Sequence, residues 1–451
     1  MNVSRGILKG ERSAQPHARR RNSWSVRLCQ PAGGWLNHST EAEYVNGSCE
    51  TVEYQFSLPQ RVDRGRRLWH NEANEIREVE EVAQRFRPSG CGSFFGDHYV
   101  YDQVVPKTHF LRQLKDLIPW EELTKGLLSC YQGGAEFGPI PYHPALLIKV
   151  LALAFLYNLS ERQVEEFVRY NLAAKFFVGL GVDQVAPDHS TLSVFKDRIL
   201  AQRGPQAFDE VFQGIVRIAK EKGIAFGPIQ IVDATHSAAD VDVKKDDERK
   251  EKGNGPRDKD AAWGSKGKKR TKTTDGKTVM VNKSFYGYKT HMSENAQSGI
   301  VTSVAATPGN WTDGKEFPRL VAKDQEAGVE AEIYAGDKGY DDGENHELLR
   351  AQGKKSALCL NDYRTEKKDS NKGLWVEMKE SAEYKEGKKE RYKIEQKNGE
   401  AKSRHGLGRC RYLGLAKYTV QALMVAMVMN LKRMVKLLCG ATMSTKLAKA
   451  A

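Results

Sequence analysis

The stretch PIQIVDATH, Pro228 to His236, decides the fold, because an apolar and β-branched run there delivers a single acidic residue, Asp233. A run this apolar is typical of a strand that is buried on both faces of a sheet. A carboxylate at the end of such a strand either opens a turn or takes part in chemistry. The order of the segments that follow favours chemistry.

Downstream, the residue pattern predicts strands and helices that carry two further acids, Asp337 and Glu395. In order, these segments are two strands, a helix, two more strands and a charged helix: Val279–Met292, Gly299–Pro308, a helix from Asp313, a strand that ends at Asp337, Ser356–Leu360 and the helix around Glu395. This order resembles that of a ribonuclease H-like core, an α/β fold whose mixed five-stranded sheet is flanked by helices. In such a core the first two acids lie on neighbouring strands, and the helix brings the third to them.

Three converging carboxylates predict a metal centre. Asp233, Asp337 and Glu395 would repel one another unless a hard divalent cation lay between them. Mg²⁺, or Mn²⁺ in its place, accepts an environment of oxygen atoms and keeps positions for water and for substrate phosphates. The constellation therefore predicts phosphoryl transfer by a two-metal mechanism.

The charged residues around Glu395 follow helical spacing. Those expected on one face are three, four and seven positions apart: Lys388, Arg391, Glu395 and Lys402. Cations beside a metal-binding glutamate suit a phosphodiester, because they hold phosphates while the glutamate holds the ion. The alternative is a solvated helix with ordinary charge pairs, and spacing alone does not decide between the two.

The same run resembles the C-terminal signature of DDE insertion-sequence transposases, and particularly that of the insertion-sequence-five group. Their pattern is Tyr, two residues, Arg, three residues, Glu, six residues and Lys. This chain matches it at Arg391, Glu395 and Lys402, and departs from it at the first place, where Lys388 stands. Further blocks that resemble the family are IVDAT, FYGYKTH, TPGNWTD and AGDKGYD, so that the resemblance covers roughly residues 105–438.

The resemblance implies a DNA transposase. Asp233, Asp337 and Glu395 would hold two Mg²⁺ ions, first for hydrolytic nicking at the ends of the element and then for transesterification into target DNA. The implied partners are double-stranded DNA, with terminal inverted repeats, and a second copy of the chain on paired ends. Two alternatives stay open: a metal-dependent nuclease on the same core, and a catalytically silent DNA-binding protein descended from a transposase.

Composition agrees with an anionic polymer as partner. The 451 residues carry a formal charge of +13, and the isoelectric point is near 9.2. Seven cysteines without regular spacing indicate neither a zinc site nor a disulfide framework, which fits a cytoplasmic protein. No apolar run is long enough and free enough of charge to predict a membrane span or a signal sequence.

We expect five parts along the chain: a mostly disordered basic extension at 1–95, a helical DNA-binding domain at 96–224, the catalytic domain at 225–440, a basic insertion within it at 240–284, and a tail at 441–451. The N-terminal part contains one predicted helix, Asn71–Phe86. The helical domain is an all-α bundle with predicted helices at 109–118, 143–158, 160–177, 190–202 and 206–223. Ser160 and Gln163 predict a capping box at the start of the third helix of this bundle.

Further residues are candidates for DNA contacts. Lys196 and Arg198 belong to a helix that either binds DNA or merely links the bundle to the core. Lys289 and His291 alternate onto one face of a strand, as phosphate contacts or supporting residues, or as an ordinary exposed face. Arg391 and Lys402 complete the set.

The segment Val241 to Thr290, which includes most of the insertion between the first two core strands, has 15 Lys/Arg against 8 Asp/Glu. We expect the insertion to be a mobile loop along a DNA backbone, because such a segment lacks the apolar residues of a core. Asp313, just before a helix, is interpreted as an N-cap.

Overall fold

The computed structural model describes residues 86–87, 97–131, 140–272, 274, 278–361 and 377–443. The expected disordered extension and its helix therefore lie outside the described residues, apart from Phe86 and Arg87, and so does most of the tail. All described residues belong to one compact unit, Val79–Ala451.

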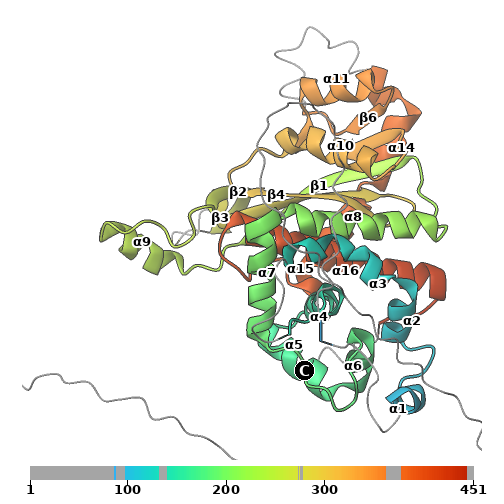
Figure 1. The fold of residues 1–451 in the computed structure, drawn as a ribbon. Helices are drawn as coiled ribbons and strands as arrows, with labels where there is room; N and C mark the ends of the chain where they lie inside the picture. The colour runs from blue at the N-terminus through green and yellow to red at the C-terminus, as the bar shows by residue number, and fades with distance from the viewer. Residues whose placement is uncertain are drawn as a thin grey trace, which may run out of the picture. The chain divides into compact units, whose positions relative to one another are not determined.

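A mixed sheet forms the middle of this unit (Figure 1). Its six strands within the described residues are β1 (Ile229–Ala238), β2 (Ala262–Lys272), β3 (Thr278–Asn295), β4 (Val301–Pro308), β5 (Ile333–Gly336) and β6 (Lys355–Leu358). β3 runs antiparallel to β1, β2 and β4, whereas β1, β5 and β6 are parallel. The order β4-β3-β1-β5-β6 is consistent with the ribonuclease H-like core expected from the sequence.

The basic insertion differs from its prediction. It was expected to be a mobile loop, but it contains a helix, α9 (Val243–Glu251), and all of β2. β2 pairs with the first half of β3, from Ala262 opposite Gly287 to Lys272 opposite Thr278. Main-chain hydrogen bonds to a partner strand need no apolar core, so the charged composition did not exclude a strand here.

Two layers of apolar side chains cover the two faces of the sheet. β5 shows the division, because Ile333 and Ala335 join one core and Tyr334, between them, joins the other. The second core is closed by the helices that follow β4 and β5, which are α10 (Phe317–Glu326) and α11 (Gly343–Ala351).

The first core is larger, and α16 (Leu415–Cys439) runs through it. This helix is apolar on most sides, and it packs against β4, α8 and α4. Asn430 is its buried polar residue at the sheet: Oδ1 accepts from Val301 N at 2.8 Å, and Nδ2 donates to Val301 O at 2.7 Å.

The helices that precede the sheet pack into this same core. In order they are α1 (Asp97–Val104), α2 (Phe110–Leu117), α3 (Trp120–Leu123), α4 (Pro144–Leu156), α5 (Glu161–Tyr170), α6 (Leu172–Val178), α7 (His189–Arg203) and α8 (Gln206–Glu221). Near residue 224, where a domain boundary was expected, the chain changes from helices to strands. The apolar core contains residues from both sides of this position. Figure 1 shows these helices on the side of the sheet where α16 lies.

Two local features decide how the chain enters and leaves α5. The predicted capping box is present, with Ser160 Oγ and the Gln163 side chain each accepting a backbone N–H. The helix expected at 160–177 is broken at Asn171, whose extended backbone starts α6 and whose side chain accepts from Ala174 N at 3.0 Å. Among the described residues no single helix is both long and apolar enough to cross a membrane, and only α4 and α5 together, bent by 106°, meet the length and composition required.

Candidate active site

Asp233 and Asp337 lie at the same edge of the sheet. In the parallel pair of β1 and β5, Ile231 is opposite Ala335. Two residues further along, the chain reaches Asp233 on β1 and Asp337 directly after β5. The carboxyl ends of parallel strands are where open α/β sheets bind ligands. The fold therefore brings these two predicted residues together.

Burial and repulsion act on this pair. Burial, together with the negative charge of Asp337, raises the pKa of Asp233 to about 7. Burial also raises the pKa of Asp337, and the carboxylate of Asp313 adds to this rise, although Gly339 N donates to Asp337 Oδ1 at 2.8 Å. Paired acids that resist ionisation in this way are typical of functional sites.

Asn398 is the helical residue that contacts Asp233. It lies on α15 (Tyr392–His405), and its Nδ2 donates to Asp233 Oδ2 at 2.8 Å. Its Oδ1 is buried and has no hydrogen-bond partner among the described residues. Such an oxygen costs about 1–3 kcal/mol to bury, unless a ligand satisfies it. Sequence reasoning missed Asn398, although its position three residues after Glu395 places it on the same side of the helix.

Glu395 lies at the solvent edge of this site. Its side chain is 54% exposed, and Oε1 accepts from Arg391 Nη2 at 3.0 Å. The two aspartates are brought together by the sheet, but the three acids are not all within ligand distance of one another: among the described residues only Glu165, Asp188 and His189 place ligand atoms within 4.8 Å of each other.

The oxygen donors around Asp233 fit a hard divalent cation. Asp233 and Asp337 offer carboxylates, Asn398 offers an unsatisfied carbonyl oxygen, and Glu395 offers an exposed carboxylate at the rim. No thiolate or imidazole of a softer metal site is needed in this set. The site therefore fits the kind of metal that the sequence predicts.

The expected common helical face is interrupted at Lys388. This residue lies on α14 (Ala382–Glu390), which ends before Arg391 and is separate from α15. Arg391 and Lys402 remain next to the acids, since the charge of Arg391 acts on both aspartates and that of Asp233 acts on Lys402. Three of the four predicted residues therefore share this side of the helix.

Lys289 and His291 support the site from β3. Lys289 Nζ donates to Asp313 Oδ1 and to Trp311 O, each at 2.8 Å. His291 is buried with Nε2 2.9 Å from Thr307 Oγ1, so it does not have the exposure that a phosphate contact requires. Of the three readings considered for His291, burial contradicts the phosphate contact and the exposed face, and the supporting role matches its position.

Asp313 corrects another prediction. It was interpreted as an N-cap, but its carboxylate accepts from Lys289, and the capping position Thr312 makes no side-chain cap either. A pattern of Asp before a helix does not reveal that a lysine from another strand takes the carboxylate. Asp313 is thus the third aspartate of the site, after Asp233 and Asp337. In the sequence it is the last residue of TPGNWTD, one of the blocks that resemble the transposase family.

Of the two candidate DNA contacts on α7, Lys196 is contradicted by its burial, and Arg198 stays a prediction. Lys196 is 5% exposed, forms an ion pair with Glu161, and lies 4.0 Å from the centre of the Tyr412 ring. Arg198 is half-buried over the ring of Tyr131, at 4.6 Å. Both side chains hold helices together in this structure, and the ammonium of Lys196 is not available to a phosphate.

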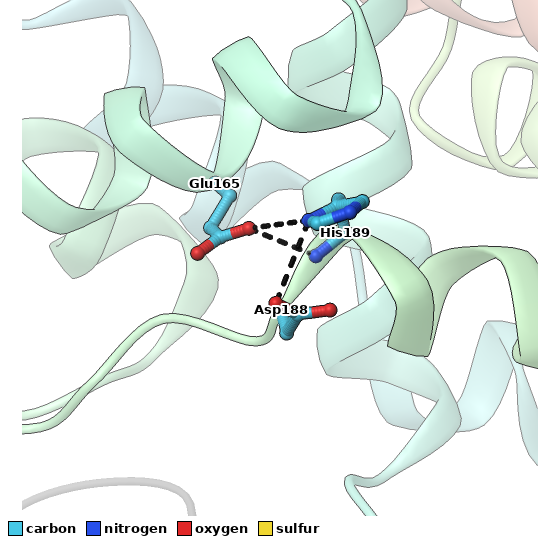
Figure 2. Close-up of side chains that lie close together, drawn as sticks. All are labelled: Glu165, Asp188 and His189. Atoms are coloured by element: carbon cyan, nitrogen blue, oxygen red, sulfur yellow. Dashed lines mark hydrogen bonds and ion pairs between the residues drawn. The ribbon is translucent and has the colours of Figure 1, made fainter. Parts of the chain in front are cut away.

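The start of α7 is fixed by a second cluster, shown in Figure 2. His189 Nδ1 lies 2.9 Å from Glu165 Oε2, which also accepts from His189 N at 3.0 Å. Asp188 caps the helix by accepting from Ser190 N at 2.6 Å. Although these three side chains have the spacing of metal ligands, their hydrogen bonds account for the arrangement by joining α5 to α7.

Two family models match the chain. One is described as "Transposase domain (DUF772)" and matches residues 99–198, and the other is described as "Transposase DDE domain" and matches residues 225–431. Among solved structures, the chain is similar to the cryo-EM structure of the piggyBac transposase synaptic complex with hairpin DNA, at a TM-score of 0.33 and 8% identity over 76% of this chain and 77% of that one. A likeness this low does not align individual residues.

The two family models confirm the resemblance to DDE transposases that the sequence motifs predicted, and the insertion-sequence-five group stays a prediction. The DDE domain implies dependence on a divalent metal. The chain belongs to the DDE transposases of insertion sequences, which are enzymes that cleave DNA phosphodiester bonds and transfer the strands.

Proposed function

We propose that this transposase, a member of the insertion-sequence-five group, uses Asp233, Asp337 and Glu395 to hold two Mg²⁺ ions at the ends of an insertion sequence. The observation that carries the proposal is the pair of aspartates at the ends of β1 and β5, with the pKa of Asp233 raised to about 7. When bound, the ions would activate water or a DNA 3′-hydroxyl and stabilise the leaving oxygen.

The other residues position the acids and the phosphate. Asn398 holds Asp233 through its hydrogen bond, and its buried Oδ1, unsatisfied among the described residues, would be a further oxygen donor for the ion. Lys289 is held by Asp313, and together with Arg391 and Lys402 it surrounds the acids with positive charge. These cations would neutralise the phosphate that enters between them. No side-chain nucleophile is needed, because water and then the 3′-hydroxyl attack directly.

The partners follow from the reaction. The substrate would be double-stranded DNA with terminal inverted repeats, followed by target DNA, with two copies of the chain on paired ends. The helices before the sheet, where the first transposase model matches, are our candidate for recognition of the repeats. We propose the cytoplasm as the place of the reaction.

The test is a cleavage and joining assay with Mg²⁺ on a fragment that carries the inverted repeats flanking this gene. We expect Asp337→Asn and Glu395→Gln to lose cleavage and joining, and to bind the fragment with an affinity close to that of the unchanged protein. Glu386→Gln is a matched control, because Glu386 is also exposed and lies on the neighbouring helix α14.

The outcomes test separately which residues hold the metal and which reaction the protein catalyses. Cleavage retained by Asp337→Asn would contradict the aspartate pair, and cleavage retained by Glu395→Gln would remove only the third ligand. Cleavage without joined product in the unchanged protein would favour a nuclease. Binding without cleavage would indicate a DNA-binding descendant.

A further inference from the structure

We propose that β2 and the first half of β3 form an arm that enters the major groove of the DNA duplex next to the scissile phosphate. The arm is defined as residues 262–272 and 278–286. The inference rests on the proposed function only in taking DNA as the substrate, and it names a surface outside the metal site.

The arm projects beyond the rest of the sheet. The last residue of β1 is paired with Gly287, and the last residue of β4 is paired with Tyr288. Before Gly287, β3 therefore has β2 as its neighbour among the paired strands. From Tyr286 to Thr278 the arm extends about 27 Å at roughly 3.3–3.4 Å per residue. That length corresponds to about eight base pairs of duplex. Figure 1 shows β2 and β3 at the end of the sheet near α9.

The root of the arm lies beside the candidate active site. His236, three residues after Asp233 on β1, is opposite Lys289 in the β1–β3 register, and its ring is 4.8 Å from that of Phe285. Lys266 of the arm lies 5.4 Å from the same Phe285 ring. A duplex held by the arm would therefore lead directly to the aspartates.

Two glycines fix the direction of the arm. A Cβ on Gly287 would overlap the carbonyl oxygen of Ser237, and a Cβ on Gly264 would overlap that of Gly309. The backbones of neighbouring strands thus approach each other more closely at the root than other residues would permit. Close backbone packing of this kind aims the arm relative to the sheet.

The charge of the arm matches a polyanion. Its two segments contain six Lys or Arg residues and no Asp or Glu. The register places Lys268 opposite Asn282, Arg270 opposite Met280, and Lys272 opposite Thr278. Directly opposed residues share a face, and so do alternate residues along a strand. One face of the arm therefore presents three cations at steps of about 6.7 Å.

Duplex DNA is the occupant that this face suits best. The major groove admits a two-stranded β-ribbon, and its base edges are read by arginine on guanine and by asparagine on adenine. Arg270 and Asn282 lie on the cationic face, and both are exposed. The opposite face carries Val279 and Val281, which are 38% and 48% exposed. A second copy of the chain packed on those valines is the competing occupant, and the test must distinguish it.

The test compares two variants with the same loss of charge. Lys268→Gln, Arg270→Gln and Lys272→Gln together alter the cationic face, whereas Lys355→Gln, Lys385→Gln and Lys389→Gln alter exposed cations on β6 and α14. Fluorescence anisotropy with the labelled inverted-repeat duplex would be measured from 50 to 200 mM salt. We expect the arm variant to reduce the magnitude of the slope of log K against log salt by roughly 1.8, for the two phosphate contacts of Lys268 and Lys272. The control variant should leave the slope unchanged.

Two further measurements complete the test. Dimethyl sulfate should be excluded from guanine N7 in the major groove beside the cleavage position, and Arg270→Gln should restore methylation there. Single-turnover cleavage at saturating protein should persist in the arm variant, unlike in Glu395→Gln, which separates this inference from the metal site. An unchanged salt slope in the arm variant would overturn the proposal, and loss of a dimer by light scattering in a Val279→Thr, Val281→Thr variant would then assign the arm to contacts between two copies of the chain.

Discussion

Replacement of Asp233 by asparagine should stabilise the metal-free protein while it abolishes cleavage. The carboxyl of Asp233 is placed where ionisation is unfavourable, because burial and the charge of Asp337 raise its pKa from 3.8 to about 7. An asparagine avoids that ionisation, and its amide oxygen still accepts from Asn398. The fold would therefore be more stable without the charge that catalysis requires.

The magnitude and its pH dependence follow from proton linkage. Because the folded pKa lies above the unfolded pKa, the folded state gains from protonation below about pH 4, and it loses this gain as pH rises to 7. A difference of about 3 pKa units corresponds to about 4 kcal/mol at most, and we expect roughly half, because the residue is partly exposed and its carboxylate is coupled to a second one. The free energy of unfolding of Asp233→Asn, relative to that of the unchanged protein, should thus rise by about 1–3 kcal/mol between pH 5 and pH 8.

The assay is urea unfolding followed by circular dichroism, in EDTA, at both pH values. Asp240→Asn is the control, since Asp240 is exposed just after β1 and pairs with Arg409, so its removal relieves no buried charge. Added Mg²⁺ should stabilise the unchanged protein and have little effect on Asp233→Asn. A variant that is no more stable than the unchanged protein at pH 8 would refute this reasoning.

Two further predictions concern residues far from the acids. Lys196→Met should lower the free energy of unfolding by about 3 kcal/mol, because Glu161 would stay half-buried without its partner, and it should not change the salt dependence of DNA binding, as anisotropy would show. Asn430→Ala should cost about 2–4 kcal/mol, because both backbone groups of Val301 lose their side-chain partner inside the core; urea unfolding with an unchanged m-value would verify it.

The strands and the aspartates were predictable because their patterns are local. An apolar run that ends in Asp233, and a second that ends at Asp337, specify buried parallel strands whose ends meet at one edge. The helices were also predictable from apolar spacing and caps, as the capping box at Ser160 illustrates. Their breaks at Asn171 and Arg391 were not, since each depends on how two short helices pack against the core.

The remaining differences depend on contacts between distant residues. Lys196 is buried because Glu161 and Tyr412 reach it from other helices, and no local pattern shows this. Asn398 and Asp313 gain their roles from Asp233 and Lys289, which lie on separate strands. For β2 the charged composition predicted a loop, and this was wrong. A charged segment can form a strand when its main chain pairs with a long partner strand, as β2 does with β3.

The ion pair at the rim suggests how the site changes when it is loaded. Glu395 is paired with Arg391 at the rim of the site, and an exposed pair of this kind costs only about 0–1 kcal/mol to break. A cation between the aspartates would attract Glu395, and Arg391 would then be released beside the position where a phosphate enters. One exchange would supply the third ligand for the metal and a cation for the substrate. We therefore expect metal binding and DNA binding to favour each other. Both would break the Arg391–Glu395 ion pair, which contributes little to stability.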